Sequence, residues 1–309
     1  MFILNRYTLR KMGAMVITLW FVITITFFLM HAIPGGPFTR EKALPPEILE
    51  ALNEKYHLDD PLAVQYFDYL KGIGRFDFGP SFKIKGTEVS KILIASAPYS
   101  AKLGAVVSIF VLLLGVPLGI VSALKQNKWQ DYIVTILATV GVAVPGFVIG
   151  TFILYMFSSK LGWLPPIGLE TWKHYIGPTL ALGGFSLAFV SRLTRSSMLE
   201  VMQQDYIRTA RAKGISEKVV IFKHALKNAL IPIVTFMGPT IAAIMTGSFV
   251  VEKIFAIPGM GKYFVESVSN RDYTMIMGAV ILYAAFYLVM ILLVDVVYAW
   301  IDPRIKLHD

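Results

Sequence analysis

Cysteine is absent from the 309-residue chain, so the chain can form neither a disulfide framework nor a thiolate metal site. Charged residues are scarce as well, at 16%, whereas 56% of the residues are hydrophobic and the mean hydropathy is +0.64. This composition is too apolar for a soluble domain and indicates a membrane protein with several spans.

Ionisable side chains are missing from six long stretches. A hydrocarbon core of ~30 Å needs roughly 20 helical residues, and backbone in lipid must satisfy its own hydrogen bonds. We therefore expect an all-α polytopic membrane protein with six transmembrane helices, the fourth needing flanking residues. We also expect the first stretch to be retained, because no signal-peptidase site precedes the turn at 34–37. The stretches without Asp, Glu, Lys or Arg are 12–33, 103–124, 132–159, 175–191, 229–251 and 273–294.

Motifs for catalysis are also lacking. The one Gly-Lys pair, Gly261-Lys262, lacks the upstream glycine of a phosphate-binding loop and is followed by Tyr263. Neither HExxH nor GxSxG occurs, and the five histidines are scattered. We therefore predict a chain that is not an enzyme and that binds no metal or cofactor of its own.

The apolar stretches also lack the buried charges on which ion-driven carriers depend. Asp295 comes nearest, at the cytoplasmic end of the sixth stretch, and we interpret it as a structural partner of a loop arginine rather than a proton relay. If the protein transports a solute, the energy must then come from another subunit.

Proline and glycine mark places where the spans are expected to bend or end. Each proline within a span removes a backbone hydrogen bond and permits a kink. The sequence Pro258-Gly259-Met260-Gly261 predicts a short turn or re-entrant segment outside the fifth span. The prolines within spans are Pro117, Pro145, Pro178 and Pro239.

Basic residues gather in particular loops and give a formal charge of +9. Nucleic-acid binding is one way to explain such a charge, but the pattern fits loops that face an anionic cytoplasmic leaflet, so no nucleic-acid partner is expected. Both termini are then cytoplasmic. The loop residues are Arg6, Arg10, Lys11, Lys125, Lys128, Arg192, Arg195, Arg208, Arg211, Lys213, Lys218, Lys223, Lys227, Arg304 and Lys306.

Residues 205–232 form the main block of short helices and charge in the second half. Asp205 is a plausible N-cap, residues 206–213 are compatible with a helix, and Gly214 supplies a left-handed stop. Ser216 and Glu217 can open a second helix. Small residues let another backbone approach closely, and basic residues can pair with acidic groups of a partner. The alternative is a basic loop that merely follows topology. The small and basic residues are Arg208, Thr209, Ala210, Arg211, Ala212 and Lys213.

The long segment 31–101 is expected to be a small extracytoplasmic domain, acting as a vestibule wall, a docking surface or a loop packed over the bundle. Pro45-Pro46 predicts the start of one helix, and Thr87 can cap another that ends before Pro98. We divide the chain into 1–30, 31–101 and 102–309, with a cytoplasmic loop at 192–228.

Motifs along nearly the whole chain resemble the permease subunits of binding-protein-dependent, ATP-driven importers, in the branch for oligopeptides, dipeptides and nickel. The resemblance is strongest to the first membrane subunit of oligopeptide permeases. The family's Glu-Ala-Ala motif is replaced by Arg208-Thr209-Ala210, with Gly214 kept, and the later proline is missing at His224-Ala225-Leu226-Lys227. Other matching motifs are Pro34-Gly35-Gly36-Pro37-Phe38-Thr39, Leu44-Pro45-Pro46-Glu47, Lys55-Tyr56-His57-Leu58, Asp77-Phe78-Gly79-Pro80-Ser81-Phe82, Gly247-Ser248, Glu252, Pro258-Gly259-Met260-Gly261, Arg271-Asp272-Tyr273, Val294-Asp295-Val296 and Ile301-Asp302-Pro303.

This resemblance implies a bacterial cytoplasmic-membrane importer of type I permease fold, with a second homologous permease, two ATP-binding subunits that carry ATP and Mg²⁺, an external peptide-binding protein and peptide cargo. It implies that residues 205–227 dock on an ATPase, with Tyr206 to Gly214 as the coupling helix. A dipeptide or nickel permease is the nearest alternative, and a secondary carrier belongs to a different class. Structural or gating roles are assigned to Pro145, Pro239, Glu252, Pro258, Gly259, Gly261 and Asp295.

Overall fold

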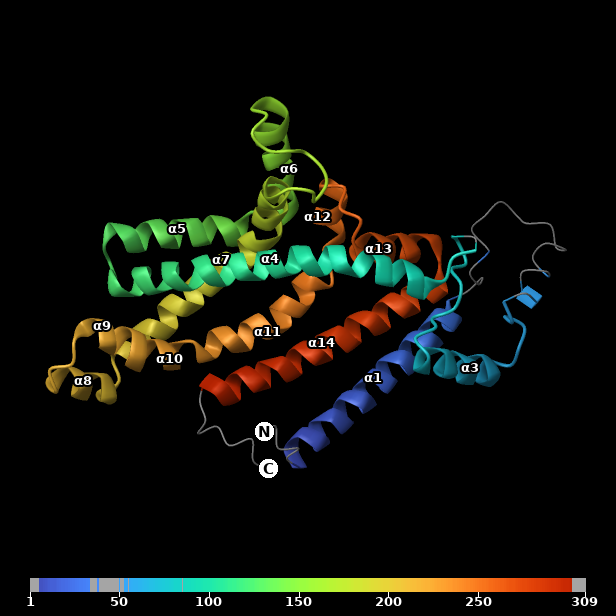
Figure 1. The fold of residues 1–309 in the computed structure, drawn as a ribbon, viewed down its shortest axis with the longest axis horizontal. Coiled ribbons are helices and arrows are strands. Elements are labelled where there is room, and N and C mark those ends of the chain that lie inside the picture. Colours follow the sequence, from blue (N-terminus) through green and yellow to red (C-terminus); the bar gives the residue numbers. More distant parts are fainter. Residues whose placement is uncertain are drawn as a thin grey trace. The chain divides into compact units, whose positions relative to one another are not determined.

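The computed structural model describes residues 6–33, 38, 50, 53–54, 56–84 and 86–301, the side chains of 6–8 and 294–301 excepted. This part of the chain is helical apart from turns and one isolated bridge between Pro80 and Glu88. Figure 1 shows the elements. They are α1 (Arg6–Ala32), α3 (Leu62–Gly74), α4 (Val89–Leu124), α5 (Trp129–Ala143), α6 (Gly146–Ile153), η1 (Leu154–Lys160), α7 (Trp172–Met202), α8 (Asp205–Ala212), α9 (Glu217–Val219), η2 (Val220–Ala225), α10 (Leu226–Ala229), α11 (Ile231–Met245), α12 (Phe249–Ile254), α13 (Met260–Asn270) and α14 (Tyr273–Ile301).

Four described helices are long and apolar enough to cross a membrane, namely α1, α4, α7 and α14. Two bent pairs pass the same test, α5 with α6 and η1, and the α9–α10 segment with α11. Counting each pair as one span gives up to six, and each of them overlaps one of the charge-free stretches. The expected all-α polytopic fold is therefore confirmed.

The helix α4 corrects one prediction. The sequence places a helix end before Pro98, yet α4 runs unbroken from Val89 to Leu124. Buried side chains fix it on both sides of the proline, with Leu93 and Leu103 each 1% exposed. Packing of this kind outweighs the one hydrogen bond that proline removes, and membrane helices tolerate proline for the same reason.

Pro145 produces a break rather than a kink. It is the N-cap residue of α6, and the two parts of this span meet at 99°. A Cβ on the next residue, Gly146, would lie 2.3 Å from the carbonyl oxygen of Ala181, so the chain turns directly against α7. Three other prolines lie inside continuous helices: Pro117 in α4, Pro178 in α7 and Pro239 in α11.

The segment around Pro258 is only partly a turn. Pro258 and Gly259 connect α12 to α13, as predicted, but Gly261 is the second residue of α13. The predicted turn is therefore two residues shorter at its end than the motif suggests. A hydrogen bond from Ile257 N to Glu252 O closes the preceding helix.

Contacts divide the chain into two compact units, Met1–Pro98 with Gly259–Leu288, and Tyr99–Pro258 with Val289–Asp309. The topological boundaries at 31 and 102 stay predictions, because contacts within the chain do not locate a membrane surface. The motifs at 34–37, 44–47 and 302–303, together with Thr39 and Lys55, lie outside the described residues, as does the helix expected at Pro45-Pro46.

In the first unit, two family motifs meet. Asp272 accepts a hydrogen bond from Ser81 Oγ and another from the backbone N–H of Phe82, at 3.1 Å. Thr274 Oγ1 donates to Pro80 O at 2.7 Å. The buried carboxylate of Asp272, 3% exposed, thus fixes the loop that the Asp77–Phe82 motif forms.

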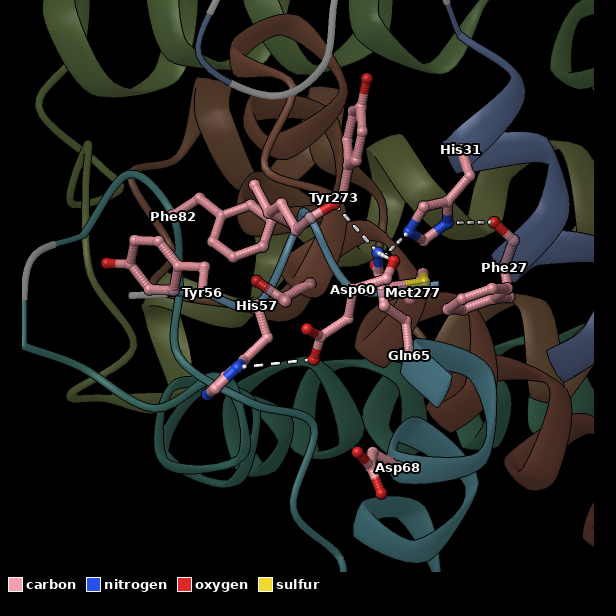
Figure 2. Close-up of a pocket in the computed structure, with 12 residues that line it drawn as sticks. Phe27, His31, Tyr56, His57, Asp60, Gln65, Asp68, Phe82, Tyr273 and Met277 are labelled. Carbon is pink, nitrogen blue, oxygen red and sulfur yellow. Dashed lines mark hydrogen bonds and ion pairs between the residues drawn. The ribbon is translucent and has the colours of Figure 1, made fainter. Parts of the chain in front are cut away.

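The same unit holds a cavity of about 330 Å³ with aromatic walls (Figure 2). Gln65 organises one side of it: its Nε2 donates to Leu58 O and Asp60 O, and its Oε1 lies 3.1 Å from His31 Nε2. Whether the 31–101 segment acts as a vestibule wall, a docking surface or a packed loop stays a prediction. The lining of the cavity is Phe27, His31, Tyr56, His57, Leu58, Asp60, Gln65, Asp68, Phe82, Tyr273, Thr274 and Met277.

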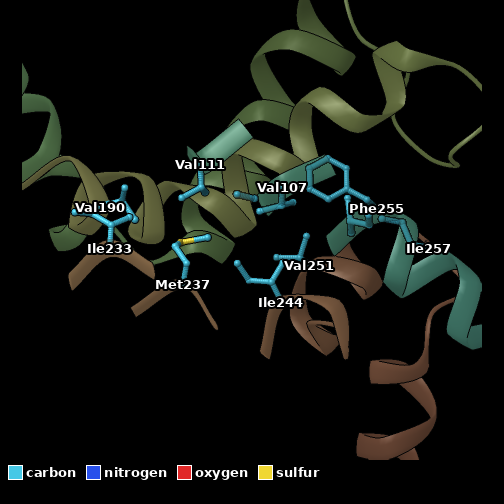
Figure 3. Packing of buried hydrophobic residues seen from close by; sticks show 11 residues of the cluster. Val107, Val111, Val190, Ile233, Met237, Ile244, Val251, Phe255 and Ile257 are labelled. Atoms are coloured by element: carbon cyan, nitrogen blue, oxygen red, sulfur yellow. The ribbon is translucent and has the colours of Figure 1, made fainter. Parts of the chain in front are cut away.

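The second unit has a continuous apolar core, part of which Figure 3 shows. Helix α4 packs closely here, since a Cβ on Gly104 would lie 2.5 Å from Met245 Cα. Small residues therefore set the separation between helices, as membrane packing requires where no hydrophobic force acts between helices. The core residues are Leu103, Val107, Val111, Ala181, Val190, Ile233, Met237, Ile244, Val251, Phe255 and Ile257.

Candidate coupling site

The N-cap of helix α8 lies one residue earlier than the sequence predicts. Gln204 is the N-cap residue, with φ −69° and ψ 149°, and it makes no side-chain cap hydrogen bond. Asp205, predicted as the cap, instead lies in the first turn, where a carboxylate still interacts favourably with the helix dipole. The physical reason for the shift is that extended backbone, not a side-chain bond, starts this helix.

The end of α8 follows the prediction. Gly214 has φ +73°, in the left-handed region where glycine carries no Cβ penalty. Ser216 then caps α9 with extended backbone, and Glu217 is its first residue. The expected helix–glycine–helix shape is therefore confirmed, with Lys213 as the residue that follows α8.

An apolar cluster attaches α8 to the bundle. Ile207 is fully buried and Ala210 is 6% exposed. Burial of one isoleucine side chain contributes about 2 kcal/mol, so this face holds the short helix in place. The cluster combines α4, α7, α8, η2 and α10, and consists of Ile120, Ala123, Met198, Ile207, Ala210, Val220, Ile221, Ala225 and Ala229.

The opposite face of α8 is exposed and carries most of the residues assigned to docking. Ala210 is the exception, because it faces the chain's own interior and can support a docking surface only from beneath. Tyr206 is 42% exposed, and its hydroxyl accepts a hydrogen bond from Asn228 Nδ2 at 2.7 Å. The exposed residues are Tyr206, Arg208, Thr209, Arg211, Ala212, Lys213 and Gly214.

Two of the basic residues expected to seek acidic partners find them within the chain. Arg211 pairs with Glu217 through Nη2–Oε1 at 2.6 Å and Nε–Oε2 at 3.2 Å. This carboxylate raises the pKa of the Arg211 guanidinium. Arg208 Nη1 lies 3.5 Å from Asp205 Oδ1, a fully solvated pair that contributes little. The Arg211–Glu217 pair therefore closes the turn around Gly214.

The sequence analysis does not predict a second group of paired polar residues near this site. Asp131 on α5 accepts two hydrogen bonds from Arg195 on α7, at 2.7 and 2.8 Å. It also accepts from Ser122 Oγ on α4 and from the backbone N–H of Asn127 at 2.9 Å. Sequence reasoning counted Arg195 only as a topological charge. The available signal was that Asp131 is the one acidic residue between Glu88 and Glu170.

The remaining predicted residues do not gather at one site. Glu252, fully buried in α12, accepts a hydrogen bond from Ser100 Oγ on α4 at 2.7 Å. Pro145 and Pro239 act through backbone shape, as described above. The side chain of Asp295 lies outside the described residues, so its pairing with a loop arginine stays a prediction. Among the described residues, no group of three or more potential ligands could hold a metal ion.

Comparison with known proteins connects this geometry to a family. The family described as "Binding-protein-dependent transport system inner membrane component" matches residues 115–307, and the corresponding N-terminal family matches residues 3–101. The chain belongs to this family. It is thus a multi-pass inner-membrane permease component of an ABC importer, as the resemblance implied.

Curated relatives align over nearly their whole length. A dipeptide transport system permease protein of Bacillus subtilis is 46% identical, over 98% of each chain. An oligopeptide transport system permease protein of Salmonella typhimurium is 45% identical, over 97% of this chain and 99% of the relative. A solved structure of the MetNI methionine ABC transporter, facing inward, matches with a TM-score of 0.54 and 15% identity, over 68% of this chain and 96% of that one. That likeness shows a shared permease fold.

Proposed function

We propose that this chain forms half of the translocation path of an ATP-driven peptide importer and couples to a cytoplasmic ATPase through α8. Its partners would be a second homologous permease, two ATP-binding subunits carrying ATP and Mg²⁺, and an external peptide-binding protein. Support for peptide cargo comes from the dipeptide and oligopeptide permeases at 46% and 45% identity. Both termini and the 205–227 segment would then be cytoplasmic.

The observation that carries the coupling role is the two-sided character of α8. One face is held by the cluster around Ile207, while the other presents exposed small and basic residues. A helix supported in this way transmits force, because it cannot shift without moving α4 and α7. Nucleotide-driven closure of the ATPases would then bias the bundle between two states.

The test is peptide uptake by proteoliposomes that contain the complete complex, comparing dipeptides with longer peptides. We expect uptake that needs ATP on the cytoplasmic side. Uptake that a proton or sodium gradient drives without ATP would contradict the proposal and favour a secondary carrier. Comparison of peptide lengths and of Ni²⁺ decides among the oligopeptide, dipeptide and nickel alternatives.

Docking itself is tested with Ala212→Arg, which enlarges an exposed residue of α8, and with Ala212→Ser as the matched control. We expect Ala212→Arg to insert and assemble normally. Its ATP-driven uptake should nevertheless fall at least about tenfold, which corresponds to a loss of ~1.4 kcal/mol of coupling free energy. Ala212→Ser should transport as the wild type does. Normal uptake and normal ATPase stimulation in Ala212→Arg would refute the docking role.

A further inference from the structure

Arg192 is an exposed arginine within α7, at the edge of the membrane-spanning stretch rather than in a separate loop. The charge-free stretch stops at residue 191, but α7 continues to Met202. Arg192 lies 20 residues after Trp172, so at 1.5 Å per residue it is ~30 Å along the helix, about the thickness of the hydrocarbon core. Its Nη2 donates a hydrogen bond to Thr139 Oγ1 on α5, at 2.7 Å.

The direction of this side chain follows from how α5 and α7 align. Asp131 pairs with Arg195, and a Cβ on Gly141 would lie 3.0 Å from Ala188 Cβ, so the two helices run antiparallel. Thr139 is therefore level with about residue 188, one helical turn closer than Arg192 to the start of α7. Helical side chains tilt toward the N-terminus of their helix, which explains this reach. The guanidinium thus extends toward the spanning stretch instead of away from it.

Aromatic rings continue the same face. Residues 185, 189 and 192 share one side of α7, because they are spaced by four and seven residues. Phe185 is 52% and Phe189 38% exposed, and their ring centroids are 6.3 Å apart. Phe189 also stacks on Phe236 of α11 at 4.2 Å. One surface across α5, α7 and α11 therefore combines exposed rings, a hydroxyl group and a cation.

The Arg192 guanidinium points from the edge of the spanning stretch into it, toward Thr139, so this surface is poorly suited to lipid. A charged side chain at membrane depth is costly unless it faces a bundle interior or a water-filled cavity. Among the described residues, no carboxylate lies within ion-pair distance of Arg192. The nearby acidic residue on α5, Asp131, pairs with Arg195 instead. A guanidinium carries five N–H donors in a fork that matches a carboxylate, and only one is used here.

We propose that this surface lines the peptide path and that Arg192 binds the C-terminal carboxylate of the passing peptide. The inference rests on the proposed peptide-import function and on no other assignment. The phenylalanine rings would contact side chains of varied peptides through their faces, while Arg192 would recognise the one anionic group that all unmodified peptides share. Arg192 is therefore assigned as a specificity-determining residue.

The experiment compares uptake of one peptide as the free acid and as the C-terminal amide, at saturating binding protein, so that capture outside the membrane does not limit the rate. Arg192→Gln removes the charge, and Arg192→Lys keeps it without the fork. Lys173→Gln is the control, because it removes one exposed positive charge from the other end of α7. We expect Arg192→Gln to slow the free acid about tenfold, as loss of one charge-assisted contact predicts, and to leave the amide unchanged. Arg192→Lys should give an intermediate loss.

Equal slowing of both peptides by Arg192→Gln, or the same selective loss in Lys173→Gln, would overturn the inference while leaving peptide import intact. Failure of the wild type to import either peptide with ATP would overturn the proposed function as well.

A second measurement does not depend on the folding of the arginine variants. Because the chain has no cysteine, Phe189→Cys provides a single thiol on the proposed surface. A bromoacetylated peptide should alkylate it only during ATP-driven turnover. Alkylation at the same rate with and without ATP, or none in a complex that transports, would contradict a position on the path.

Discussion

A single buried carboxylate joins three helices of the second unit. Asp131 is 4% exposed and binds Arg195, Ser122 and the backbone of Asn127. At the residue scale, Asp131 meets the requirement that a buried charge be paired and hydrogen-bonded, because every oxygen of the carboxylate has a donor. The sequence contained both charges, but only spatial alignment of α5 with α7 shows that they pair.

We predict that Asp131→Asn lowers the free energy of unfolding by about 3 kcal/mol, because it leaves the half-buried Arg195 guanidinium without its counter-charge. The melting temperature of the purified protein in detergent measures this. Glu170→Gln, an exposed acidic residue of the 161–171 loop, is the control and should melt as the wild type does. Equal melting of both variants would show that the pair contributes nothing.

Glycine at position 119 is a second residue whose role is visible only in three dimensions. A Cβ there would lie 2.5 Å from both Ser191 O and Thr194 Cβ on α7. Gly119→Ala should therefore push α4 from α7 and cost about 1–3 kcal/mol, as overpacking typically does. Gly13→Ala, where nothing lies within 4 Å, should be neutral or slightly stabilising. Matching thermal shifts in the two variants would argue against close packing at Gly119.

At the scale of elements, α8 illustrates what local sequence can and cannot predict. Gly214 and Ser216 have strong backbone preferences, so the end of α8 and the start of α9 could be read from the chain. The buried side of the helix could not, because Ala210 and Ala212 look equivalent until their neighbours are known. The prediction of a helix end before Pro98 was wrong, because the buried contacts of α4 outweigh the local preference of proline.

The two alanines of α8 therefore make a paired prediction. Ala210→Arg places a long charged side chain in the apolar cluster and should reduce the amount of folded permease that co-purifies with its partners. Ala212→Arg should leave that amount unchanged and impair coupling only. Quantitative co-purification separates the two effects. If both variants assemble equally well, the buried face of α8 does not hold the helix.

At the scale of the whole molecule, six charge-free stretches were enough to predict the all-helical membrane fold. These stretches could not predict the right-angled break at Pro145, because composition indicates which residues can enter lipid but not where a span changes direction. The division into two compact units was likewise hidden, since it joins segments as distant as residues 81 and 272.

The absence of cysteine permits a clean test of topology. Lys213→Cys and Leu161→Cys place single thiols on exposed segments at opposite ends of α7. A membrane-impermeant maleimide should label the first only in inside-out vesicles and the second only in right-side-out vesicles. Labelling of both from the same side would contradict the proposed orientation and the cytoplasmic position of α8.

The break at Pro145 also has a consequence for the surrounding bilayer. Helix α5 has 15 residues and is therefore ~22 Å long, and α6 leaves it at 99°, so where α5 crosses the bilayer upright this span reaches less deep than a hydrocarbon layer of ~30 Å. Lipid beside it must then thin to avoid hydrophobic mismatch, at a cost that grows with acyl-chain length. Membranes of shorter-chain lipids should thus accommodate this permease with less deformation than thick ones.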